Sequence, residues 1–250
     1  MKKALLVLFA VVLFSPVFAQ DKTISLTSLE WPPYTSASLA EQGASSAVAV
    51  AAFKAMGYTL KIDFYPWERA VNLAKTDSPY SGYFPEYWSD DNAKDFVYSD
   101  PMGVGPLGFV ERKDAPVKWK TLDDLKGITI GTVSGYINTT QFDSMAASKV
   151  LTVEAVDDDA TNIAKVANGR IPLAVIDPNV MRYLLKTDPS LAGYKDQVEF
   201  NAKVLEMKKL YVCFKPGAEG QRLSKIFDAG LKKIDVEKVM QDYFASVFSQ

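Results

Sequence analysis

The chain has 250 residues, of which 48% are hydrophobic and 23% are charged, so it can form one large globular domain or two small ones. With 28 basic and 30 acidic residues, its formal net charge of −2 argues against nucleic acid or an anionic membrane as a partner. The absence of histidine excludes Ser-His-Asp and Cys-His catalysis in their usual forms, and every His-ligated zinc site.

Residues 1–19 have the pattern of a secretory signal peptide. Two lysines precede an apolar run at 4–14, and Val17-Phe18-Ala19 is a typical cleavage site. The run has about 11 residues, far fewer than the roughly 20 that a membrane-spanning helix needs. We therefore expect an exported protein, cut after Ala19, whose 26 basic (28 minus two) and 30 acidic residues give a net charge of −4. Cys213 is the only cysteine, and without an internal disulfide the periplasm is the favoured location.

Strand and helix patterns alternate through the first hundred residues. Strands carry apolar residues at every second position, and helices carry them at every third or fourth. Glycine and proline mark several boundaries, as at Gly57, Pro66 and Pro85. In chain order the sequence predicts strands at 23–29, 58–64 and 81–84, and helices at 45–56, at 66–74 and from Ser89.

A second alternating series follows a glycine-rich segment at 103–113. It predicts strands at 128–133, 150–156, 171–176, 198–200 and 210–214, and helices at 138–148, 159–168, from Pro178, at 223–234 and at 236–247. Such alternation indicates parallel sheets covered on both faces by helices. We expect two α/β lobes. The first contains residues 20–109 and 210–250, because the final helices follow a return strand, and the second contains residues 110–209.

Two consecutive prolines lie between large aromatic residues at the end of the first predicted strand. Pro32 and Pro33 lack backbone donors, so the strand must end there and the chain must leave the sheet. Trp31 and Tyr34 are thereby held at the carboxyl end of a strand, where open α/β sheets bind their ligands. The alternative interpretation is that both rings cap a core.

Five short motifs follow one another along the rest of the chain. They are Glu30-Trp31-Pro32-Pro33-Tyr34, Pro66-Trp67-Glu68-Arg69-Ala70, Tyr98-Ser99-Asp100-Pro101, Thr121-Leu122-Asp123-Asp124-Leu125-Lys126-Gly127, and Gly169-Arg170-Ile171 leading to Asp177. In order and spacing they resemble the family 3 extracellular solute-binding proteins, the periplasmic receptors of amino-acid-type ABC importers. The resemblance implies an α/β, two-lobed type II periplasmic binding protein (Venus-flytrap) fold with two crossover segments, near 108–112 and 208–214.

The resemblance also implies a mechanism and a set of binding partners. Its lobes close like a hinge around a small-molecule ligand, which is delivered to the membrane permease of an ABC importer. A monomer is expected, with no cofactor, no metal and no nucleic acid as partner.

Residues are carried over from the family one by one. Its ring-stacking positions fall on Trp31 and Trp67, and its acceptor of the ligand amine falls on Asp177. Alternatively, Trp67 belongs to the apolar stripe of its own helix, and Asp177 is the N-cap of the helix that Pro178 begins. The two roles of Asp177 can coexist.

A further segment carries three candidates for the lining of the cleft. Tyr83, Glu86 and Tyr87 lie where the family usually lines its site with backbone groups and small hydroxyls. Glu86 is unusual there, and the alternative is a solvated surface glutamate.

Two departures concern the family's recognition of an α-carboxylate. Its arginine aligns with Gly108, and its hydroxyl-bearing helix start is here Gly135-Tyr136-Ile137. Without the guanidinium fork, bidentate recognition of a carboxylate is lost. The possible substitutes are Arg69, Arg112, Ser134 and Asn138. With Glu86, Asp177 and two tryptophans, a small amine or organic cation is the hypothesis for the ligand.

Three function classes follow. The first is a receptor that captures a small polar solute (an amino acid, an amine or a related compound) between its lobes for an ABC importer. The second is a separate sensor subunit that reports the solute to a membrane signalling protein. The third is an enzyme on the same scaffold, in which Glu86 or Asp177 would act as general acid or base. The absence of histidine disfavours this class, so we expect a protein that is not an enzyme.

Overall fold

The computed structural model describes residues 22–76 and 79–249 of the chain. The predicted signal peptide at 1–19 lies outside these residues. No helix of the described part is long and apolar enough to cross a membrane.

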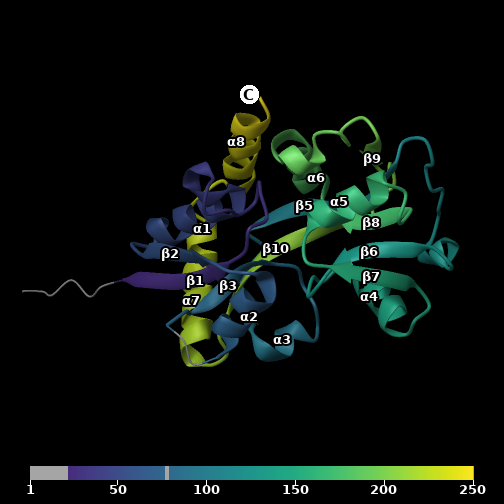
Figure 1. The fold of residues 1–250 in the computed structure, drawn as a ribbon. Helices are drawn as coiled ribbons and strands as arrows, with labels where there is room; N and C mark the ends of the chain where they lie inside the picture. The colour runs from purple at the N-terminus through teal and green to yellow at the C-terminus, as the bar shows by residue number, and fades with distance from the viewer. Residues whose placement is uncertain (1–21, 77–78, 250) are drawn as a thin grey trace, which may run out of the picture.

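The first lobe combines the amino-terminal elements with the last two helices (Figure 1). Strand β1 pairs in parallel with β2 and β3. Helix α1 packs against α7 and α8, and Phe53 of α1 meets Phe227 of α7 with ring centroids 5.0 Å apart. Its elements are β1 (Thr23–Ser28), η1 (Ala40–Gln42), α1 (Ala44–Ala55), β2 (Thr59–Phe64), α2 (Trp67–Lys75), β3 (Gly82–Glu86), α3 (Asn92–Asp95), β4 (Val97–Tyr98), α7 (Ala218–Leu231) and α8 (Val236–Phe248).

The second lobe is a smaller α/β unit. Strand β6 pairs in parallel with β7 and β8, and Ile130, Phe142 and Leu173 are buried in its core. Its elements are η2 (Leu122–Leu125), β6 (Thr129–Val133), α4 (Thr140–Ala147), β7 (Thr152–Val156), α5 (Asp159–Ala167), β8 (Leu173–Ile176), α6 (Pro178–Thr187), η3 (Pro189–Leu191) and β9 (Val198–Phe200).

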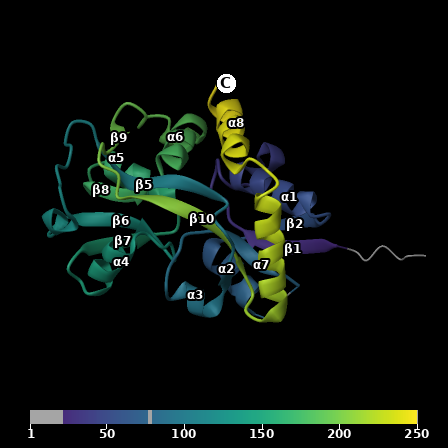
Figure 2. The same cartoon turned by 180° about the vertical axis from the view of Figure 1, so that it is seen from behind.

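Two long strands run from one lobe to the other (Figure 2). They are β5 (Gly103–Arg112) and β10 (Glu206–Phe214), which pair antiparallel at 103–107 and 206–210. Beyond this shared segment, β5 continues along β8 and β9, whereas β10 continues along β3 and β4. The strand order is therefore β2-β1-β3-β10-β5-β8-β6-β7. The predicted crossover segments, 108–112 and 208–214, lie in these two strands.

Candidate functional site

A small cavity, with about 30 Å³ of space open to a water-sized sphere, lies where strand ends of the first lobe meet a loop of the second. The first lobe contributes the end of β1, the start of α2 and the end of β3, and the second contributes the loop after β6. This is the carboxyl edge of the parallel strands, the usual place for a ligand in α/β proteins. The cavity is lined by Leu29, Trp31, Trp67, Pro85, Glu86, Tyr87, Tyr136, Ile137 and Leu210.

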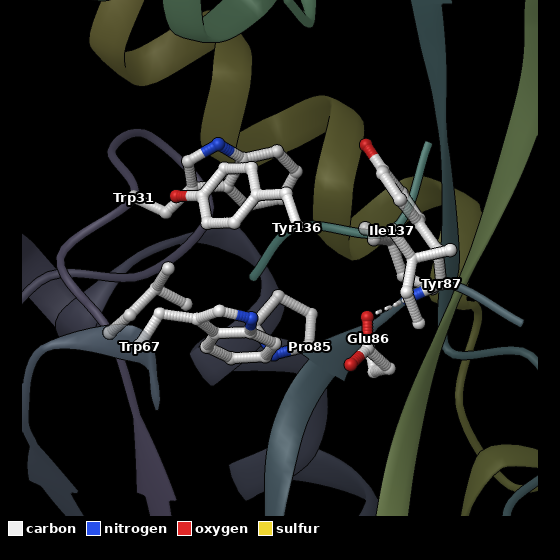
Figure 3. A pocket seen from close by; sticks show the side chains of 9 residues that line it. Trp31, Trp67, Pro85, Glu86, Tyr87, Tyr136 and Ile137 are labelled. Atoms are coloured by element: carbon white, nitrogen blue, oxygen red, sulfur yellow. Dashed lines mark hydrogen bonds between the residues drawn. The ribbon is translucent and has the colours of Figure 1, made fainter. Parts of the chain in front are cut away.

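Aromatic rings form the walls of this cavity. In Figure 3, Trp31 and Tyr136 lie on one side of the space, Trp67 and Pro85 lie on the other, and Glu86 lies at its edge. Trp31 stacks on Tyr34 with centroids 4.5 Å apart, so its position is fixed from behind. Trp67 contacts Tyr136 edge-on at 6.1 Å, and its Nε1 donates to the Gly135 carbonyl at 3.1 Å. Trp67 therefore connects the two lobes at the cavity wall.

Glu86 is a buried carboxyl group at the edge of the cavity, only 6% exposed. Its Oε1 accepts from the Tyr87 backbone N–H at 2.8 Å, and its Oε2 accepts from the Tyr83 hydroxyl at 3.0 Å. Burial raises the pKa of Glu86 to about 8, although these hydrogen bonds and the nearby Lys208 act in the opposite direction. No ion pair of the described residues includes Glu86.

Asp177 does not line the cavity and is bonded within the protein. Its Oδ1 accepts from the backbone N–H groups of Asn179 and Val180, which makes it the N-cap of α6. Its Oδ2 accepts from the Tyr34 hydroxyl at 2.9 Å, and that hydroxyl accepts from Asn179 Nδ2 at 2.9 Å. Burial raises the pKa of Asp177 to about 7. The carboxylate that the resemblance assigns to the ligand amine thus joins the lobes through Tyr34.

Removal of the Tyr34 hydroxyl is expected to destabilise the contact between the lobes. In Tyr34→Phe the buried Asp177 and the partly buried Asn179 each lose a partner, and the expected loss is about 1–3 kcal/mol of unfolding free energy. Urea unfolding measures this loss, and Tyr58→Phe is the control because its hydroxyl accepts from Arg222, which is exposed. Equal losses of unfolding free energy in the two variants would show that the Tyr34–Asp177 hydrogen bond stabilises the protein no more than an exposed hydrogen bond does.

The other predicted site residues do not all lie at the cavity. Tyr83 is buried behind Glu86, and Arg69 is exposed with its guanidinium 5.0 Å from the centre of the Tyr65 ring. Ser134 and Asn138 line a larger groove of about 730 Å³, which shares Tyr136 and Ile137 with the cavity and in which Asn138 bonds Asp143. The cavity therefore brings together Trp31, Trp67, Glu86, Tyr87 and Tyr136, with Tyr34 and Tyr83 directly behind their rings and carboxyl group.

Asp159 is a buried acid that the sequence analysis assigned only to the start of a helix. It accepts a hydrogen bond from the Trp31 side chain, and burial with the charge of Asp177 raises its pKa to about 7. With Asp157 and Asp158 it lines an outer groove of about 430 Å³. This groove shares four lining residues with the cavity, namely Leu29, Trp31, Trp67 and Tyr136. The run of three aspartates was the available signal. In the described part of the chain, no group of His, Cys, Asp or Glu side chains could hold a metal ion.

The position of the family's carboxylate-binding arginine is filled by another side chain. A Cβ atom at Gly108 would lie 2.4 Å from Cζ of Phe200, so the Phe200 ring occupies that space. Arg112, one possible substitute, is paired with Asp114. None of the residues that line the cavity is cationic.

Restoring an arginine at position 108 is expected to destabilise the protein by at least about 1 kcal/mol, because Phe200 must move to admit it. Gly193→Arg is the matched control, since a Cβ there meets nothing within 4 Å, and it is expected to change stability by no more than about 0.5 kcal/mol. Thermal unfolding compares the two. An unchanged midpoint for Gly108→Arg would show that Phe200 yields freely.

Solved structures resemble the chain in fold. The sensor domain of a histidine kinase with similarity to periplasmic binding proteins aligns with a TM-score of 0.75 and 17% identity over 91% of this chain and 96% of that one. The amino acid ABC transporter substrate-binding protein AbpA from Streptococcus pneumoniae, bound to L-arginine, aligns with a TM-score of 0.71 and 13% identity. The alignment covers 92% of this chain and 97% of that one. The GluR0 ligand-binding core from Nostoc punctiforme, in complex with L-glutamate, aligns with a TM-score of 0.70 and 15% identity. The alignment covers 91% of this chain and 100% of that one.

These similarities confirm the predicted two-lobed periplasmic binding protein fold. No protein-family model and no curated protein matches the chain by sequence.

Proposed function

We propose that this chain is an exported solute-binding protein whose two lobes enclose a small amine or organic cation in the cavity between them. The observation that carries the proposal is the buried Glu86 carboxyl group at the edge of an aromatic cavity that contains no cationic side chain. Ionisation of this buried carboxyl group is costly, and the nearby Lys208 is paired with Glu206, so a bound cation would lower that cost.

The aromatic walls suit a cationic ligand energetically. A cation over an aromatic face gains up to about 2 kcal/mol when desolvated, and Trp31, Trp67 and Tyr136 offer three faces. A charge-assisted hydrogen bond to Glu86 would add orientation to this attraction. The space that a water-sized sphere can reach in this cavity is only about 30 Å³, roughly the volume of one water molecule, so the lobes must open further to admit the solute.

The proposed role of the protein is to deliver its bound ligand to the permease of an ABC importer. The structural similarity to an amino acid ABC transporter substrate-binding protein supports this role, and so does the signal-peptide pattern of residues 1–19. A second role, a solute sensor for a membrane signalling protein, is supported by the similarity to a histidine kinase sensor domain. Crosslinking in intact cells distinguishes them, because an importer receptor should be recovered with a permease and a sensor with a kinase.

The proposed ligand class is tested by a thermal-shift screen of the pure protein against amines, amino acids, betaines, small acids and oligosaccharides. A ligand at a hundred times its dissociation constant should add about 2.7 kcal/mol of stability. The bound compound should be recovered unchanged, because no catalytic role is proposed. Tight binding of a plain anion, unaffected by Glu86→Gln, would contradict the proposal.

A further inference from the structure

A chain of hydrogen bonds with a fixed direction leads from the interior of the first lobe to Glu86. It begins at the backbone carbonyl of Tyr87, which can only accept and receives the Tyr98 hydroxyl proton at 3.0 Å. The Tyr98 oxygen must then accept its own hydrogen bond, and Asn92 Nδ2 donates to it at 2.8 Å. The carbonyl therefore determines which end of the Asn92 amide faces the tyrosines.

The same amide nitrogen determines the direction of the next link. Asn92 Nδ2 lies 2.6 Å from the Tyr83 hydroxyl and donates to it. The Tyr83 proton is then free to go to Glu86 Oε2, 3.0 Å away. The other carboxyl oxygen of Glu86 accepts from the Tyr87 backbone N–H, which can only donate. Both oxygens of Glu86 thus receive donors from the protein.

We propose that Asn92 and Tyr83 are positioning residues that stabilise the ionised form of Glu86, in which both carboxyl oxygens only accept hydrogen bonds, so that the group bound to it in the cavity must be a donor. This inference rests on the proposed function and narrows its ligand class. The class is an amine that carries at least one N–H when protonated, and it excludes quaternary ammonium compounds, which offer cation–π attraction but no donor.

The charged and titratable surroundings of Glu86 are consistent with this role. Lys208 of β10 is the nearby cation that lowers the pKa of Glu86, and its Nζ lies 5.2 Å from the centre of the Tyr87 ring. The remaining titratable neighbours are Tyr83, Tyr87, Tyr98, Tyr136 and Cys213, whose pKa values are all raised, chiefly by burial. They remain neutral and provide no competing anion.

The direct test is a titration of the Glu86 carboxyl by ¹³C nuclear magnetic resonance in the unliganded protein, with its signal assigned by loss in Glu86→Gln. Tyr83→Phe removes the donor, so the pKa of Glu86 should rise by about one to two units. Asn92→Asp, nearly identical in shape, replaces the donor by an acceptor and should also raise this pKa. Tyr194→Phe is the control, because its hydroxyl likewise accepts from an amide, that of Asn168, far from the cavity.

The titration and the binding experiments test two different claims, the positioning role of Tyr83 and Asn92 and the ligand class of the cavity. A Glu86 pKa that moves no more in Tyr83→Phe than in Tyr194→Phe would overturn the positioning role, whatever the protein binds. The ligand class is tested by calorimetry with benzylamine and benzyltrimethylammonium, and benzylamine should bind at least about tenfold more tightly. A lack of preference for benzylamine would overturn the donor requirement. Circular dichroism confirms that each variant is folded.

Discussion

Replacement of Glu86 by glutamine is expected to weaken the binding of a cationic ligand by at least about 30-fold. Loss of one partner of a buried, hydrogen-bonded charge pair costs about 2–5 kcal/mol, and 2 kcal/mol corresponds to roughly 30-fold in the dissociation constant. Glutamine preserves the shape of the side chain and one acceptor oxygen, so the loss reports on the charge. Calorimetry with the amine that gives the largest thermal shift measures the effect.

The control for this variant is Glu237→Gln, which removes the same charge from an exposed position on α8. Its affinity should equal that of the wild type within about twofold. Unchanged affinity in Glu86→Gln would show that the ligand does not use this carboxylate, and the proposed ligand class would be wrong.

The unfolding free energy of the unliganded protein is expected to fall by several kcal/mol between pH 5 and pH 9. Burial raises the pKa of Glu86 to about 8 and the pKa values of Asp159 and Asp177 to about 7. In the unfolded chain these groups ionise near pH 4, so above that pH the folded state binds more protons than the unfolded state. Stability therefore decreases as pH rises, until the folded pKa values are passed.

Other acids act in the opposite direction but at lower pH. Hydrogen bonds from Lys94 and Arg112 lower the pKa values of Asp91 and Asp114, which are fully exposed. Their stabilising effect is present above the unfolded pKa, near pH 4, and is lost only below it. They therefore do not cancel the trend between pH 5 and pH 9.

Urea unfolding at several pH values measures this dependence. Glu86→Gln should show a smaller fall than the wild type, because one of the three groups no longer titrates. A saturating amine should stabilise the wild type more at pH 9 than at pH 6, since Glu86 must lose its proton to hold a cation. Stability that is constant or rises from pH 5 to pH 9 would show that these carboxyl groups are not buried in solution.

The two-lobed fold could be predicted from the sequence because it follows from local patterns. The alternation of strands and helices, the Pro32-Pro33 exit from β1 and the return strand near the end each have a local cause. The position of Trp31 at a strand end likewise follows from the prolines beside it. These features do not depend on how the lobes meet.

The contacts across the lobes could not be predicted in the same way. Tyr34 and Asp177 are 143 positions apart, and their hydrogen bond depends on the closure of one lobe onto the other. From the sequence alone, Asp177 has two possible roles, ligand acceptor and helix N-cap, and the structure shows the N-cap together with a bond to Tyr34. Similarly, no local pattern indicates that Phe200 fills the space beside Gly108.

Glu86 illustrates the limit most clearly. As a single residue after Pro85 it resembles a solvated surface glutamate, yet every residue of β3 is buried. The reason is that β3 lies between β1 and β10 in the sheet, and β10 comes more than a hundred residues later in the chain. Burial of this carboxyl group is therefore a property of the assembled sheet.

The most direct test of the central claim is calorimetry with compounds that share a benzyl skeleton and differ only in their polar group, namely benzylamine, benzyl alcohol and benzoate. We predict that the amine binds to the wild-type protein, that its binding is weakened in Glu86→Gln, and that the alcohol and the carboxylate bind far more weakly. Tighter binding of benzoate, or equal binding of the amine to the wild type and Glu86→Gln, would contradict the claim that this cavity selects a cation through Glu86.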